Sequence, residues 1–102
     1  AVEAEKIIDF QVVRFMHWMR SLDSVPTIRS LRDQVETLRE AELADAKRRL
    51  ANGENPEQVL EHFSRNLSRK FSHAPSQALK QASQEGNASL INSTRRLFKL
   101  KP

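Results

Sequence analysis

The sequence predicts an all-α fold, an elongated helical bundle of two long helices, one of medium length and two short ones. Only 2 of the 102 residues are Gly and 4 are Pro, so little of the chain is suited to turns. Apolar residues recur at helical spacing in separate narrow stripes. Each stripe must be buried against a neighbouring helix, in the same chain or in a second copy. We therefore expect residues 1–102 to form a single helical domain that assembles as a dimeric bundle.

Residues 2–22 are predicted to form the first helix. Its main apolar stripe has steps of four, three, four and three positions, the heptad spacing of a coiled-coil seam. The stripe consists of Ile8, Val12, Phe15, Met19 and Leu22. Other apolar residues widen this surface, so we expect more than one neighbour to cover the helix. Pro26 should end it, because the residue before a proline disfavours the α region, and the chain should then turn back as an αα-hairpin.

The second predicted helix, residues 26–51, begins with Ser24 or Val25 as its cap, Ser24 being the better acceptor, and has Pro26 in its first turn. Its stripe has steps of three, four and three positions and lies on one face. The stripe consists of Ile28, Leu31, Val35 and Leu38. It then slips by about one position and resumes at Leu43, Ala46 and Leu50. Oppositely charged side chains lie four residues apart on the other faces. Gly53 supplies the left-handed residue at which the helix should end.

Three shorter helices are predicted after this turn. Residues 56–72 begin with Asn55 as N-cap and Pro56 in the first position. The expected core residues of this helix are Val59, Leu60, Phe63, Leu67 and Phe71. A break is expected at Pro75, followed by a helix over 75–85 with Leu79 and Ala82 inside and a stop at Gly86. The last helix, residues 88–98, should bury Leu90, Ile91, Leu97 and Phe98.

The composition excludes several kinds of chemistry. The chain has no cysteine, so it offers no thiolate nucleophile, disulfide or thiolate metal site. Two isolated glycines cannot form a phosphate-binding loop. The acidic residues Glu36, Glu40 and Glu42 have arginines one turn away, so we expect a solvated ion-pair network rather than acid–base catalysis. We therefore predict no catalytic, cofactor-binding or metal-binding residue.

The three histidines are predicted to have structural roles. They lie far apart in the sequence without carboxylates at ligand spacing, whereas a metal site needs converging ligands. We expect His17 to be partly buried with a hydrogen-bonded ring, and His62 to point away from the core stripe. His73 should cap the helix end that precedes Pro75.

Charge is distributed unevenly along the chain. Residues 1–61 hold 9 basic and 12 acidic side chains, net −3, whereas residues 62–102 hold 8 basic and 1 acidic, net +7. The basic part suits phosphate or an acidic partner, although a solvated surface is the favoured explanation. No apolar run approaches the 18 or more residues that span a bilayer, so no membrane contact is expected. The chain starts within an amphipathic pattern without Met, which suggests a fragment of a longer protein.

Two segments together resemble a known family. PTIRSLRDQVETLREAEL contains Arg-x-x-Glu-Leu, and SRKFSHAPSQALKQAS contains Lys-x-x-His-x-Pro. At this separation they resemble the C-terminal dimerisation domain of glutamyl-tRNA reductase, from the first helix to about Ala82. The sequence departs from that pattern at Ser72, where an apolar residue is expected. The matching positions are Pro26, Ile28, Leu31, Arg32, Glu36, Arg39, Glu42, Leu43, Phe63, Lys70, His73, Pro75 and Leu79.

The resemblance implies part of a cytoplasmic enzyme that uses NADPH to reduce glutamate carried on tRNA(Glu) to glutamate 1-semialdehyde, in tetrapyrrole (porphyrin and haem) synthesis. In that family a long spinal helix joins the catalytic, nucleotide-binding and dimerisation domains, and two subunits form a V. Residues 1–24 would be the distal end of that helix. The family's catalytic cysteine and dinucleotide fingerprint have no counterpart here, so NADPH and most of the tRNA would be bound outside this fragment.

The sequence therefore favours a homodimer held by the two long helices. The expected interface residues are Ile8, Val12, Phe15, Met19, Leu22, Ile28, Leu31, Val35 and Leu38. The alternative is a helical module that contacts tRNA phosphates through its basic C-terminal half. Its candidate contacts are Arg65, Arg69, Lys70, Arg95 and Arg96.

Overall fold

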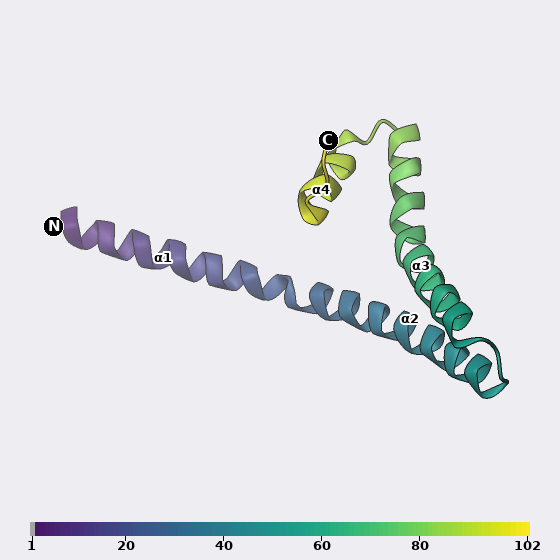
Figure 1. The fold of residues 1–102 in the computed structure, drawn as a ribbon. Coiled ribbons are helices and arrows are strands. Elements are labelled where there is room, and N and C mark those ends of the chain that lie inside the picture. The colour runs from purple at the N-terminus through teal and green to yellow at the C-terminus, as the bar shows by residue number, and fades with distance from the viewer. Residues whose placement is uncertain (1) are drawn as a thin grey trace. The chain divides into compact units, whose positions relative to one another are not determined.

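A computed structural model describes residues 2–102, which form helices and no strand (Figure 1). The helices are α1 (Val2–Asp23), α2 (Val25–Ala51), α3 (Pro56–Gln84) and α4 (Ala88–Phe98). The predicted all-α class is confirmed. The chain divides into two compact units, an N-terminal unit that ends at Thr37 and a C-terminal unit, Leu38–Pro102. Among the described helices, none is both long and apolar enough to cross a membrane.

In the N-terminal unit, the predicted hairpin between the first two helices is wrong. Only Ser24 separates α1 from α2, and one residue is shorter than the two to five that an αα-hairpin needs. The two helices follow one another without a reversal and make no long-range contact (Figure 1). Ser24 does not cap α2 as predicted, because its hydroxyl donates back to the carbonyl oxygen of Ser21 at 2.8 Å.

In the C-terminal unit, the turn between α2 and α3 forms as the sequence predicts. Gly53 has φ +82°, the left-handed conformation that a helix C-terminus favours. The amide of Glu54 then donates to the carbonyl oxygen of Arg49 at 3.1 Å. Asn55 caps α3, since its side-chain oxygen accepts from the amide of Gln58 at 3.2 Å. These local contacts connect the second half of α2 to α3.

The predicted break at Pro75 is wrong, because α3 continues through it to Gln84. The proline removes one backbone hydrogen bond, and Figure 1 shows α3 bending along its length. The helix continues because good helix formers follow the proline and Ala82, only 2% exposed, is buried in the C-terminal unit, where α3 packs on α4. His73 therefore lies inside a helix, exposed, and does not cap a helix end as predicted.

The helix α4 has the ends that the sequence predicts. Gly86 has φ +70°, and the side-chain oxygen of Asn87 accepts from the amide of Leu90 at 3.1 Å. At the other end Lys99 adopts a left-handed conformation with φ +54°, and the amide of Leu100 donates to the carbonyl oxygen of Arg95 at 2.9 Å. This arrangement satisfies the last carbonyl groups of the helix.

The core is small and lies in the C-terminal unit. Its buried apolar residues are Ala46, Val59 and Ala82. The half-buried apolar residues around them are Leu38, Leu43, Phe63, Leu67, Leu79 and Ile91. Several predicted core residues are instead exposed, because each lies off the packed face of its helix or at an edge that nothing in the described chain covers. These are Leu50, Leu60, Phe71, Leu90, Leu97 and Phe98.

We predict that Asn55→Ala lowers the free energy of unfolding by about 1 kcal/mol, because the first turn of α3 loses its capping acceptor. Urea denaturation followed by circular dichroism measures the change. Asn52→Ala is the matched control, since Asn52 lies in the same turn and its side chain is not the cap. Equal losses in the two variants would contradict the capping role.

Candidate functional site

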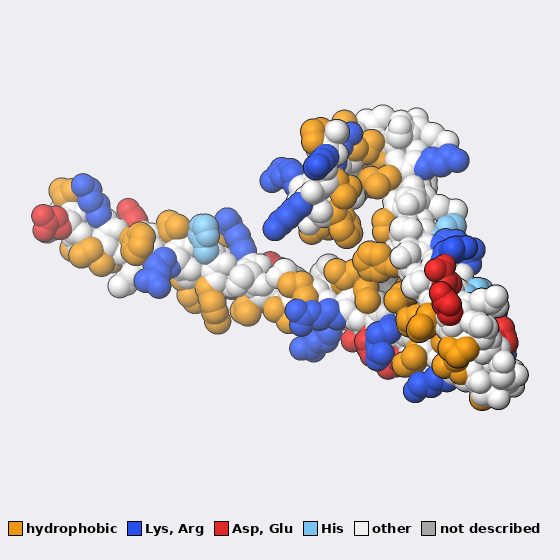
Figure 2. All heavy atoms as spheres, in the orientation of Figure 1, with side chains coloured by type: hydrophobic (Ala, Val, Ile, Leu, Met, Phe, Trp, Pro, Cys, Tyr) orange, Lys and Arg blue, Asp and Glu red, His pale blue; other side chains and the backbone are white. Residues whose placement is uncertain are grey.

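The exposed apolar surface of α1 is the most prominent feature of the N-terminal unit. No described residue of α1 is buried. Its large apolar side chains, from Val2 to Leu22, are between 43% and 68% exposed, and Figure 2 shows them along the helix. A monomeric protein rarely exposes so continuous an apolar surface, which is typical of an interaction site.

The predicted seam of α1, named here the α1 seam, lies on this surface. It consists of Ile8, Val12, Phe15, Met19 and Leu22. Each of the five is 48% to 59% exposed. The rings of Phe15 and Trp18 lie 5.9 Å apart between centroids, so Trp18 extends the surface to one side of the seam. No predicted member is used in packing within the described chain, which leaves all five available to a partner.

The corresponding stripe of α2, named the α2 seam, is also uncovered. Ile28 is 47% exposed, Leu31 is 55% exposed and Val35 is 37% exposed. Leu38, the last predicted member, is half-buried in the C-terminal unit. The first three residues of the α2 seam are therefore exposed, and the fourth, Leu38, packs within the C-terminal unit.

A second apolar strip lies on the opposite side of α1. Phe10 is 63% exposed and Val13 is 53% exposed, and both lie away from the heptad positions of the α1 seam. The guanidinium carbon of Arg14 lies 5.9 Å from the centre of the Phe10 ring, within cation–π range. This strip agrees with the expectation that more than one neighbour covers α1.

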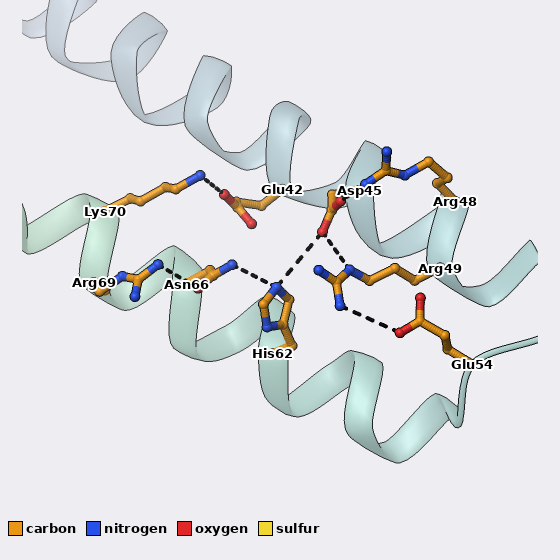
Figure 3. A network of polar contacts seen from close by, with 9 residues as sticks. All are labelled: Glu42, Asp45, Arg48, Arg49, Glu54, His62, Asn66, Arg69 and Lys70. Atoms are coloured by element: carbon orange, nitrogen blue, oxygen red, sulfur yellow. Dashed lines mark hydrogen bonds and ion pairs between the residues drawn. The ribbon is translucent and has the colours of Figure 1, made fainter. Parts of the chain in front are cut away.

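A buried carboxylate links α2 to α3. Glu42 is only 4% exposed and its carboxylate pairs with the ammonium group of Lys70 (Figure 3). The prediction that Glu42 belongs to a solvated network is therefore wrong. Glu42 lies four residues from both Leu38 and Ala46, on the face that packs against α3. An acidic residue inside an apolar stripe was the signal that sequence reasoning missed.

A polar cluster lies beside this pair. Arg69 donates to the side-chain oxygen of Asn66 at 3.0 Å, which leaves the amide nitrogen of Asn66 to donate to Nε2 of His62 at 2.9 Å (Figure 3). The same Nε2 lies 4.0 Å from a carboxylate oxygen of Asp45. His62 therefore faces α2, contrary to prediction, and His17 is exposed rather than partly buried.

Asp45 is the acidic centre of that cluster. Its carboxylate pairs with Arg48 and accepts from Nε of Arg49 at 3.0 Å. Desolvation alone would raise the pKa of Asp45, but the hydrogen bonds and positive charges of the two arginines outweigh it and hold the pKa below the usual carboxyl value. Arg49 also lies 3.5 Å from the carboxylate of Glu54 and so ties the end of α2 to the turn.

The structure does not bring the predicted tRNA-contact residues together as one free basic patch. Arg65 pairs with Glu61 at 3.3 Å, and Arg69 and Lys70 are engaged by Asn66 and Glu42. On α4, Arg95 lies 3.5 Å from the side-chain oxygen of Asn92. The neighbouring Arg96 is exposed, and its side chain makes no hydrogen bond or ion pair with another described residue.

No metal-binding arrangement occurs among residues 2–102, where no three His, Cys, Asp or Glu side chains converge. A shallow apolar groove of about 200 Å³ lies between α3 and α4. Its apolar lining includes Phe71, Pro75, Leu79, Phe98 and Leu100. This groove therefore offers apolar contact rather than convergent polar groups.

Comparison with known proteins identifies a family. The family model described as "Glutamyl-tRNAGlu reductase, dimerisation domain" matches residues 3–100, which extends the resemblance beyond Ala82. Glutamyl-tRNA reductase of Nitrosomonas europaea is 49% identical over 98 residues, which cover 96% of this chain and 24% of that protein.

Two further relatives agree. The glutamyl-tRNA reductases of Aromatoleum aromaticum and Thiobacillus denitrificans are 46% and 42% identical over 97% and 98% of this chain, and each match covers 24% of the relative. The chain thus spans about a quarter of the length of these curated relatives. No solved structure matches it.

We predict that Lys70→Met lowers the free energy of unfolding by about 2–4 kcal/mol, because it leaves the buried carboxylate of Glu42 unpaired. Glu42→Gln should cost less, since Lys70 is half-exposed and can be hydrated. Chemical denaturation measures both. The control is Lys80→Met on the same helix, and an equal loss in that variant would show that the ion pair has no special role.

We predict that the Asp45 cluster makes the stability depend on pH. The pKa of Asp45 is lower in the folded chain than in the unfolded chain, so its contribution is fully present above the ordinary carboxyl pKa and is lost as the pH falls through the lowered value. Thermal unfolding between about pH 6 and pH 2.5 tests this. Below about pH 4, the stability of the Asp45→Asn variant should fall less steeply with pH than that of the natural chain. If the two plots of stability against pH run parallel, the assignment to Asp45 is contradicted.

Proposed function

The chain belongs to the family of glutamyl-tRNAGlu reductase dimerisation domains, and from this we propose that it joins two copies of a longer reductase chain as a homodimer. The α1 seam and the α2 seam would form the contact between the copies. In a two-fold symmetric dimer, a surface of one copy contacts either the same surface or a different surface of the second copy. Such dimers are the commonest assemblies of identical chains.

The exposure of α1 is the observation that supports this proposal most directly. A helix of 22 residues with no buried residue makes no tertiary contact that would hold it in place. Most of the stability of a helix in a protein comes from packing its apolar face and not from the propensity of its residues. A second copy supplies that packing.

The energies show that both seams are needed. Covering a half-exposed large apolar side chain gains about 1 kcal/mol. The five residues of the α1 seam would then supply on the order of 5 kcal/mol, comparable with the low end of what association itself costs. The three open positions of the α2 seam add to this, and a tight dimer requires still more contact.

For the parent protein we infer the reaction that the names of its relatives indicate. It would be a cytoplasmic oxidoreductase that uses NADPH to reduce glutamyl-tRNA(Glu) to glutamate 1-semialdehyde for tetrapyrrole and porphyrin synthesis. The present chain contains no cysteine to attack the substrate and only two glycines, so the chemistry would be performed by other parts of the enzyme. Its own contribution is to hold two subunits together.

Contact with tRNA through the basic C-terminal half stays a prediction, as the alternative function of this chain. Three of its five candidates are engaged by Glu61, Asn66 and Glu42 within the C-terminal unit, which weakens the case for a phosphate-binding patch.

We predict that Val35→Glu converts a dimer to a monomer, because it places an unpaired carboxylate in the α2 seam. A cost of several kcal/mol for that charge weakens the dimer by roughly a thousandfold. Light scattering across a dilution series measures the mass. The natural chain should have twice the monomer mass, and Gln34→Glu, one position away from the seam, should keep it. A stable Val35→Glu dimer would remove this face from the interface.

A further inference from the structure

The outer side of α4 is a second uncovered apolar surface, separate from both seams. Leu90 is 42% exposed and Leu97 is 76% exposed, and the seven positions between them place both on one side of the helix. These two residues are named here the α4 face. The adjacent side of α4 packs against α3: Ile91 and Thr94 on it are half-buried, and Phe98 lines the groove between the two helices. The α4 face lies beside this packed side and is exposed.

The surroundings of the α4 face are strongly basic. Four basic side chains lie between Asn87 and Pro102, and this segment contains no acidic residue. They are Arg95, Arg96, Lys99 and Lys101, of which Arg95 lines a groove with Leu79 of α3 and the other three lie outside it. Figure 2 shows Lys and Arg side chains beside apolar ones on α4. Pairing the α4 face with the same face of a second copy would bring like charges together, so an acidic surface of the partner copy fits it better.

An acidic edge of the required kind runs beside the α1 seam. Asp9 and Asp23 are two heptads apart and Glu5 precedes Asp9 by four residues, so all three lie along one side of α1. All three are exposed, and none forms an ion pair with another described side chain. Val12 of the α1 seam lies three positions after Asp9, which sets an apolar strip directly beside this edge.

We propose that the α4 face of one copy packs against the α1 seam of a second copy, with its basic residues along the edge formed by Glu5, Asp9 and Asp23. This assignment rests on the proposed homodimer and specifies which surfaces meet. Two-fold symmetry makes the contact twice, because each copy offers one α4 face and one α1 seam. The contact between the α4 face and the α1 seam adds apolar area to that buried by the two seams. The complementary charges determine which surface of the second copy the α4 face meets.

The first test compares two substitutions that place a carboxylate at highly exposed leucines of the 102-residue chain. Leu97→Asp lies in the α4 face, and Leu60→Asp, at a site 65% exposed on α3, is the matched control. Sedimentation equilibrium should show a dimer dissociation constant at least tenfold higher for Leu97→Asp and unchanged for Leu60→Asp, with the helix content of both preserved in circular dichroism. Equal constants would overturn the assignment.

The second test reverses charges and does not depend on apolar packing. Glu5→Lys with Asp9→Lys, and separately Arg96→Glu with Lys99→Glu, should each raise the dissociation constant by roughly tenfold. Combining the two sets should restore it to within about threefold of the natural chain, because opposite charges meet again. Losses that multiply without any rescue would overturn the proposal.

The outcomes separate this inference from the homodimer itself. A natural chain that is monomeric at every concentration would contradict the proposed function and this contact with it. A natural dimer that Val35→Glu splits but Leu97→Asp leaves intact would keep the proposed function and overturn the α4 contact. If the α4 charge reversal leaves the dimer unchanged but abolishes binding of an unmodified tRNA at low salt, the basic residues serve RNA and the contact is again overturned.

Discussion

The uncovered apolar side of α1 is the constraint on which the rest of the structure depends. Leaving such a surface open to water is unfavourable, and α1 has no neighbour of its own in the described residues. Ser24 contributes to the exposure of α1. Its hydroxyl and its amide both donate to the carbonyl oxygen of Ser21, so the chain continues in a helical direction and does not turn back on α1. The first helix is thus presented to a partner rather than folded back on the second.

The C-terminal unit is held by a different kind of contact. Its apolar core is small, and the second half of α2 is joined to α3 by the pair between Glu42 and Lys70 and by the cluster around Asp45. These polar contacts fix the register of the two helices, since sliding α3 by one turn would leave the buried carboxylate of Glu42 without a partner. The exposed apolar side chains thus stay available for contact with another chain, while the polar pairs fix how α2 and α3 pack within this one.

The sequence predicted the parts of the fold that depend on local chemistry. Gly53, Asn55 and Gly86 mark helix ends through backbone conformation and capping, which act within a few residues. The hairpin at Ser24 and the break at Pro75 were wrong because each rests on one local signal that the surrounding helix overrides. Past Pro75, strong helix formers and the packing of Ala82 outweigh one missing hydrogen bond.

The candidate site divides in the same way. Heptad spacing alone located the apolar residues from Ile8 to Val35, since periodicity reports the face of a helix directly. Spacing could not show that Glu42 meets Lys70 or that His62 faces Asp45, because these contacts depend on the register between two helices. Nor could it show that Leu97 would be left exposed, because that depends on how α4 sits on α3.

The most direct test of the central claim is hydrogen exchange of the α1 amides at several protein concentrations. If a second copy covers α1, its amides should be protected at high concentration and should exchange progressively faster on dilution, while amides of the α2–α3 turn region keep a constant rate. Protection of α1 that does not change with concentration, across a range in which the mass is also constant and monomeric, would contradict the account.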